Sequence, residues 1–149
     1  MAVFNFRLAQ VLRLQQAVED MEKRKLQQRL GELAQAEEAL AQAREQRIRF
    51  LGRMQQAEAG GLPAAQLITW RNWHPVLAQR EEERQQERVT AEEAVDEQRQ
   101  HVYRARLERR TLEQLEERQK EQFMLAQAQL EQVALDELAV QSWPNGERL

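Results

Sequence analysis

The side chains that could act in catalysis or bind a metal are two histidines and many carboxylates. The histidines are His74 and His101, and the 149 residues include no cysteine. The sequence therefore offers no thiol nucleophile and no Cys-ligated zinc site. The two histidines also do not form the helical His-x-x-x-His pair that binds zinc. We predict no metal site.

Carboxylate runs such as Glu81–Glu83 and Glu116–Glu117 have arginines at helical spacing, which is typical of solvated salt-bridge faces. The only glycine cluster, Gly60–Gly61, is followed by Leu62–Pro63. A phosphate-binding loop would have Lys-Ser or Lys-Thr at that point. The sequence therefore predicts a protein that is not an enzyme and that uses no cofactor.

Two basic clusters could bind an acidic partner. The first comprises Arg44, Arg47, Arg49 and Arg53, and the second comprises Arg99, His101, Arg104, Arg106, Arg109 and Arg110. Both clusters could instead pair with glutamates within the protein. RNA recognition favours stacking aromatics among the basic residues, and only Tyr103 is close. A net charge of −3 also argues against general binding to phosphate backbones. We expect no nucleic-acid partner, and an RNA-binding helical arm is the alternative function.

The aromatic pair Trp70 and Trp73 follows the glycine cluster at a spacing of i, i+3. With Ile68, Leu77 and Phe50 nearby, the pair could close one end of the fold as an apolar plug. Alternatively, one ring stays exposed and anchors a partner, because tryptophan is enriched in binding hot spots. Phe50, Trp73 and Leu77 are our candidates for binding residues in this region.

The elements that position these residues must be helices. Aromatic residues make up only 5% of the chain, whereas charged residues make up 32%. The chain therefore has too few large apolar side chains to fill a compact core. Strands would need more β-branched residues than a chain with two Ile and three Thr offers. They would also need more turns than five Gly and three Pro can form. The composition predicts an all-α protein with long helices.

Glycines and prolines set the expected boundaries within one coiled-coil domain, 1–149. Asn5 is a plausible N-cap for the first helix. Pro75 should interrupt the second helix, because it removes a hydrogen bond and crowds the carbonyl of Arg71. The prediction is a first helix over about 5–58, a turn over about 59–63, a short helix over 64–73, a kink at 75 and a helix over about 76–142.

Apolar residues recur in alternating steps of three and four, as in a heptad seam. In the first helix these are Leu26, Leu30, Leu33, Leu40, Leu51 and Met54, with Val11, Val18 and Met21 in a shifted register; in the second they are Val95, Val102, Ala105, Leu112, Phe123, Ala126, Leu130, Val133 and Val140. A short turn makes the two helices antiparallel partners. Their charges favour this pairing, since 1–58 sums to +2 and 63–143 to −5. We also expect the polar positions Glu37, Arg44 and Arg47 to face 79–88.

The second helix is longer than the first, so we expect Lys120–Val140 to lack a partner. This segment is apolar and includes Phe123, Met124, Leu125, Leu130, Val133, Leu135 and Leu138. It could fray or self-associate, or it could be a docking helix for another protein.

The expected location is the cytoplasm. No apolar run approaches the length that crosses a bilayer, roughly 20 residues. The first residues lack the basic start and apolar stretch of a secretory signal. We therefore expect no direct insertion into a membrane.

Two short motifs stand near the ends of the chain: the opening Val3–Leu12 reads VFNFRLAQVL, and Leu135–Ala139 reads LDELA. Both resemble the FliJ family of the flagellar type III export apparatus. The glycine turn with an aromatic segment after it is also similar, and the likeness spans nearly the whole chain. The resemblance implies an antiparallel two-helix coiled coil like the stalk of a rotary ATPase. An alternative of the same class is the equivalent stalk protein of a virulence type III secretion system, which would differ only in its partners.

The resemblance also implies partners and positions for their contacts. The partners would be the hexameric export ATPase, the cytosolic domain of the export gate, and export chaperones. The gate would be contacted near the hairpin turn by Phe50, Trp73 and Leu77, with Gln46, Arg80 and Arg84 around them. The ATPase would be contacted at the terminal end by Phe4, Phe6, Phe123, Leu130, Val133 and Leu138. Such a protein would sit at the inner-membrane export apparatus as a peripheral component.

Overall fold

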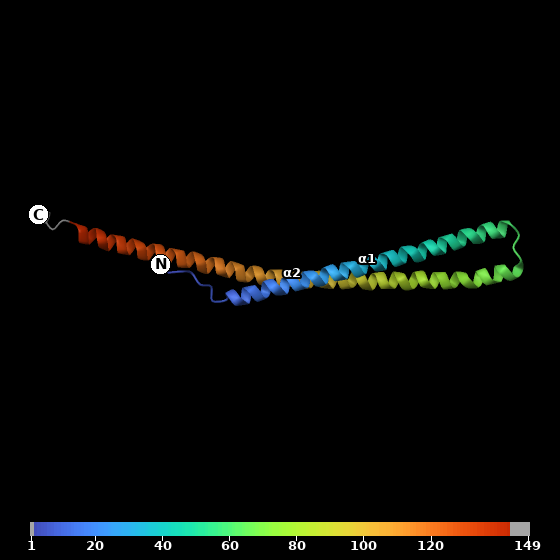
Figure 1. The fold of residues 1–149 in the computed structure, drawn as a ribbon, viewed down its shortest axis with the longest axis horizontal. Coiled ribbons are helices and arrows are strands. Elements are labelled where there is room, and N and C mark those ends of the chain that lie inside the picture. The colour runs from blue at the N-terminus through green and yellow to red at the C-terminus, as the bar shows by residue number, and fades with distance from the viewer. Residues whose placement is uncertain (1, 144–149) are drawn as a thin grey trace. The chain divides into compact units, whose positions relative to one another are not determined.

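The computed structural model describes residues 2–143 and contains two long α-helices (Figure 1). Helix α1 spans Ala9–Ala59 and helix α2 spans Ala64–Ser142. No strand occurs among the described residues. The two helices pack against each other, so the fold is an all-α helical hairpin, as the composition predicted.

The helices pair in two compact units. One unit is formed by the described residues of Met1–Glu19 and Ala105–Leu149, and the other by Asp20–Arg104. The first is called the terminal unit below, and the second the turn unit. Each unit contains one stretch of α1 and one stretch of α2, and the turn that joins the helices belongs to the turn unit.

The turn between the helices depends on one glycine and one proline. Gly61 has a φ of 78°, a left-handed conformation that favours glycine at the end of a helix. The amide of Gly60 donates to the carbonyl of Gln56 at 3.1 Å, which closes the last turn of α1. The carbonyl of Pro63 then accepts from the amide of Gln66 at 3.0 Å as α2 begins. Proline suits this position because its own missing N–H is not needed there.

α2 continues through Pro75, so the predicted separate helix over 64–73 is wrong. Proline in a helix leaves the carbonyl of Arg71 without its usual donor, at a cost of about 3 kcal/mol. Packing on both sides of Pro75 offsets this cost. Before it, the Trp70 ring lies 5.8 Å from the Phe50 ring, and after it Leu77 is buried.

α1 begins at Ala9, later than the start predicted near Asn5. The residues before it are not helical, and the carbonyl of Phe6 accepts from the amide of Ala9 at 3.1 Å. Phe6 is buried, and the Phe4 ring lies 5.7 Å from the ring of Phe123. Phe4 and Phe6 are therefore both packed although they lie outside the helix.

The buried and half-buried side chains follow a seam with steps of three and four. On α1 the seam is Leu12, Gln15 and Glu19 in the terminal unit, and Glu22, Leu26, Leu33, Ala36, Leu40, Ala43, Arg47, Phe50, Met54 and Ala57 in the turn unit. On α2 it is Leu77, Glu81, Arg88, Ala91, Val95, Gln98 and Val102 in the turn unit, and Ala105, Arg109, Leu112, Glu116 and Phe123 in the terminal unit. The shifted register expected for Val11 and Met21 is wrong, since both are exposed.

Candidate functional site: two partner-binding surfaces

The turn unit brings the three predicted gate-binding residues together around one shallow pocket. The pocket has a volume of about 330 Å³ and is lined by Gln46, Arg49, Phe50, Arg53, Trp73, Leu77 and Arg80. Phe50 and Leu77 are both seam positions, so they form an apolar floor. Gln46 and Arg80 lie around them as predicted, whereas Arg84 does not line the pocket and pairs with Glu87 at 2.9 Å.

The two neighbouring tryptophans have different surroundings. Trp70 is half-buried and its ring contacts that of Phe50. Trp73 is 44% exposed, and the guanidinium of Arg80 lies 5.4 Å from its ring centroid. A cation over the ring face holds an exposed indole in place. Trp70 thus has the environment of the apolar plug, and Trp73 that of the exposed anchor.

The pocket rim is strongly basic. Three of its lining residues are arginines and none is acidic. The surrounding sequence 46–80 contains five arginines and one glutamate. Arg49 pairs with Glu45, whereas no ion pair of Arg53 occurs within residues 2–143. The pocket therefore combines an exposed aromatic anchor with positive charge, which suits an acidic protein segment with an apolar side chain.

The other arginines near the turn face carboxylates on the opposite helix. The Nε atom of Arg44 lies 3.5 Å from Glu81, and Arg47 pairs with the same carboxylate. Arg44 also donates to Gln85 at 3.4 Å. These contacts confirm the expected pairing of Arg44 and Arg47 with the stretch 79–88, while Glu37 is exposed.

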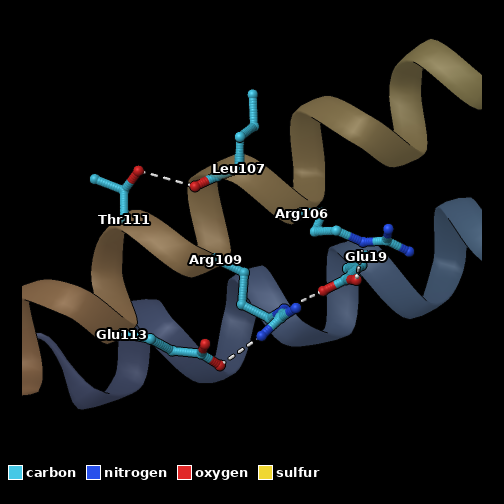
Figure 2. A network of polar contacts seen from close by, with 6 residues as sticks. All are labelled: Glu19, Arg106, Leu107, Arg109, Thr111 and Glu113. Atoms are coloured by element: carbon cyan, nitrogen blue, oxygen red, sulfur yellow. Dashed lines mark hydrogen bonds and ion pairs between the residues drawn. The ribbon is translucent and has the colours of Figure 1, made fainter.

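The second basic cluster also pairs largely within the protein. Arg99 lies 3.5 Å from Asp96, and His101 lies 4.0 Å from Glu97. In the terminal unit, Arg109 pairs with Glu19 of α1 and with Glu113 at 2.7 Å (Figure 2). The pairing with both glutamates raises the pKa of Arg109 above its ordinary value. Internal ion pairs thus account for these members of the cluster.

Sequence reasoning missed the central residue of that network. Glu19 is 3% exposed, and its carboxylate also lies 3.6 Å from the Nε atom of Arg106 (Figure 2). The signal was the regular spacing of Leu12, Gln15 and Glu19, which extends the heptad of the rest of α1 backwards. It was hidden because Val11, Val18 and Met21 define a competing apolar stripe.

The terminal unit holds the predicted ATPase-binding residues in three different environments. Phe6 is buried, and Phe4 and Phe123 are half-buried against each other. Phe4 and Phe123 also line a hollow of about 540 Å³ together with Ala2, Val3, Lys120, Met124, Gln127 and Glu131. Leu130, Val133 and Leu138 are exposed. These three exposed residues lie on α2 beyond Gln127.

The predicted unpartnered segment is shorter than Lys120–Val140. Phe4 contacts Phe123, so the first part of that segment has a partner. Every described side chain from 128 to 143 is exposed, although α2 stays helical to Ser142. This stretch, 128–143, is called the terminal segment below.

The described part of the chain has no grouping of three or more His, Cys, Asp or Glu side chains suited to a metal ion. Within it, neither helix has an apolar stretch that could cross a membrane.

Comparison with known protein families identifies one family that matches the chain. A family model described as the flagellar FliJ protein matches residues 4–148, which is nearly the whole length. No curated protein and no solved structure matches the chain significantly. The match includes both helices, the turn with its basic pocket, and the terminal segment. The chain belongs to the FliJ family and is a component of the flagellar protein export apparatus.

Proposed function

We propose that this protein binds the export ATPase ring and the export gate at the same time, and so couples ATPase assembly and activity to protein export. The observation behind the proposal is that two exposed recognition surfaces lie in different units. One is the basic aromatic pocket of the turn unit, and the other is the apolar terminal segment. Because the two surfaces are made of different residues in different units, the two partners need not compete for the same side chains.

The pocket is the proposed contact for the cytosolic domain of the export gate. Trp73 supplies the exposed anchor, while Phe50 and Leu77 supply the apolar floor. Arg49, Arg53 and Arg80 favour an acidic gate segment, because opposite charges steer encounter and suppress wrong partners. The same pocket could take an acidic segment of an export chaperone, which would then compete with the gate.

The terminal unit is the proposed contact for the hexameric export ATPase. Leu130, Val133 and Leu138 present apolar side chains on an intact helix. Phe4 and Phe123 extend this surface, and Phe6 is buried within the same unit. The proposed location is the cytoplasmic side of the inner membrane, where the protein is held by these partners.

The test uses full-length variants that lose one surface each. Trp73→Ala should weaken binding to the purified gate domain by roughly tenfold or more and leave ATPase stimulation unchanged. The triple variant Leu130→Ala, Val133→Ala and Leu138→Ala should lose ATPase stimulation and keep its binding to the gate domain. Alanine is the best helix former, so α2 should stay helical in circular dichroism.

Matched controls remove exposed apolar side chains outside both surfaces. Tyr103→Ala is the control for Trp73→Ala, and a triple Leu14→Ala, Ile48→Ala and Leu107→Ala is the control for the terminal segment. Loss of both activities in either test variant, or in the controls, would contradict two separate surfaces. Tight, salt-dependent binding of RNA without binding to either protein would favour the RNA-binding alternative.

A further inference from the structure

The seam of α2 continues beyond the part of it that is buried. Ala105, Arg109, Leu112, Glu116 and Phe123 are buried or half-buried seam positions of the terminal unit. The same steps of three and four continue through Leu130, Val133, Glu137 and Val140. There Leu130 is 63% and Val140 76% exposed, and no side chain within residues 2–143 covers them. The terminal segment therefore has the pattern of one strand of a coiled coil.

The paired part of α2 shows how this protein treats a charged seam position. Arg109 lies opposite Glu19 of α1, as Figure 2 shows. Glu81 is likewise paired with Arg47 of α1. These two charged groups are met across the seam by the opposite charge, whereas Arg88 pairs with Glu92 on α2 itself. A half-buried ion without a partner is costly. Glu137 is the charged seam position of the terminal segment, and it has no ion pair within the described residues.

The side chains around Glu137 form a hollow of matching chemistry. It has a volume of about 350 Å³ and is lined by Val133, Asp136, Glu137, Val140 and Gln141. The spacing i, i+3, i+4, i+7 is that of the hole into which a coiled-coil partner inserts a side chain. The two valines can pack against the aliphatic part of a partner side chain, and the two carboxylates can pair with its positive charge. Arginine and lysine have both an aliphatic part and a positive charge.

The wider charge pattern excludes other occupants. From Glu121 to Trp143 the chain has four acidic residues and no Lys or Arg. A second copy packed on this face would bring like charges together, which destabilises a coiled coil. An anionic lipid surface or a nucleic acid would be repelled for the same reason.

We propose that the terminal segment is one strand of a heterotypic coiled coil whose other strand is a basic amphipathic helix of the partner, with an Arg or Lys opposite Glu137. The inference rests on the proposed function only for the identity of this partner, the export ATPase. The chemistry of the missing strand follows from the seam, the hollow and the charge of this chain.

The first experiment needs no natural partner. The probes are two synthetic three-heptad helices with the same leucine seam, one with Arg at a central seam position and flanking Lys, the other with Glu at all of these positions. The full-length protein should bind the basic helix and not the acidic one. Glu137→Gln should weaken binding to the basic helix by roughly tenfold.

The matched control for Glu137→Gln is Glu93→Gln. Glu93 is an exposed residue of α2 outside the terminal segment, and its substitution changes the net charge equally. Equal binding of the two helices, or equal weakening by the two substitutions, would overturn the proposal. A dimer of the protein alone that depends on Glu137 in analytical ultracentrifugation would also overturn it, because the occupant would then be a second copy.

The second experiment uses the export ATPase and separates this inference from the proposed function. Binding should weaken with added salt and with Glu137→Gln, because charged contacts are screened. Binding that is lost in Leu130→Ala but insensitive to salt and to Glu137→Gln would overturn the basic strand and leave the proposed function intact. If the wild-type protein does not bind the ATPase, the proposed function fails, and the synthetic helices alone decide the inference.

Discussion

At the scale of single residues, the seam contains polar side chains with specific partners on the other helix. Gln98 is buried, and its amide donates to the carboxylate of Glu22 and to the backbone carbonyl of Glu22 at 3.0 Å. The hydrogen bond from Gln98 lowers the pKa of Glu22 below its ordinary value of 4.5, and the nearby Lys25 acts in the same direction. Such pairs make the stability of the hairpin depend on pH.

The sign of this dependence follows from the lowered pKa. A carboxyl whose pKa is lowered by folding stabilises the folded state fully above its unfolded pKa and loses this effect as pH falls through its folded pKa. We expect the melting temperature of the wild type to exceed that of Glu22→Gln at pH 7, and the difference to shrink as pH falls below about 4.5. A thermal melt followed by circular dichroism measures this. A difference that stays constant down to pH 3 would contradict the assignment.

A second prediction at this scale concerns the network of Glu19. Glu19→Ala leaves Arg109 without its partner on α1, so the melting temperature should fall. The double variant Glu19→Leu and Arg109→Leu should recover much of the loss, because an apolar pair of similar size can replace an ion pair in a seam. A double variant that is less stable than either single variant would argue against a pair that acts mainly within the seam.

At the scale of elements, α2 is continuous where the sequence predicted a break. Pro75→Ala restores an N–H donor for the carbonyl of Arg71, so it should raise the free energy of unfolding by about 1 to 3 kcal/mol. Gln100→Ala is the control, because it changes only an exposed side chain of the same helix. Urea denaturation of the two variants measures the difference. A destabilised Pro75→Ala would show that the proline geometry is needed by the packing around Trp70.

The helical class, the antiparallel pairing and the position of the turn could be predicted, because they depend on local preferences and on the glycines at 60 and 61. The continuation of α2 through Pro75 could not be predicted, since it depends on how well Phe50, Trp70 and Leu77 pack near the lost hydrogen bond. The register near the N-terminus was also missed. Val11 and Met21 look like core residues, yet a buried Glu19 with two arginine neighbours outweighs them.

Sequence reasoning could name candidate binding residues more readily than their surroundings. Phe50, Trp73 and Leu77 could be chosen because they lie near the tryptophan pair after the turn, and the structure places all three around one pocket. The arginines at the rim come from both helices, so their convergence requires the register of the pairing. The same holds for Phe123, which was expected to be unpartnered and lies against Phe4.

At the scale of the whole molecule, the proposed function requires that one chain holds two partners. A bridging assay tests this directly: the gate domain is immobilised, and capture of the export ATPase is measured in the presence of this protein. Wild-type protein should capture the ATPase. Trp73→Ala, the Leu130→Ala/Val133→Ala/Leu138→Ala triple, and an equal mixture of the two should not, because no chain in the mixture has both surfaces. Capture by the mixture at the wild-type level would contradict the account.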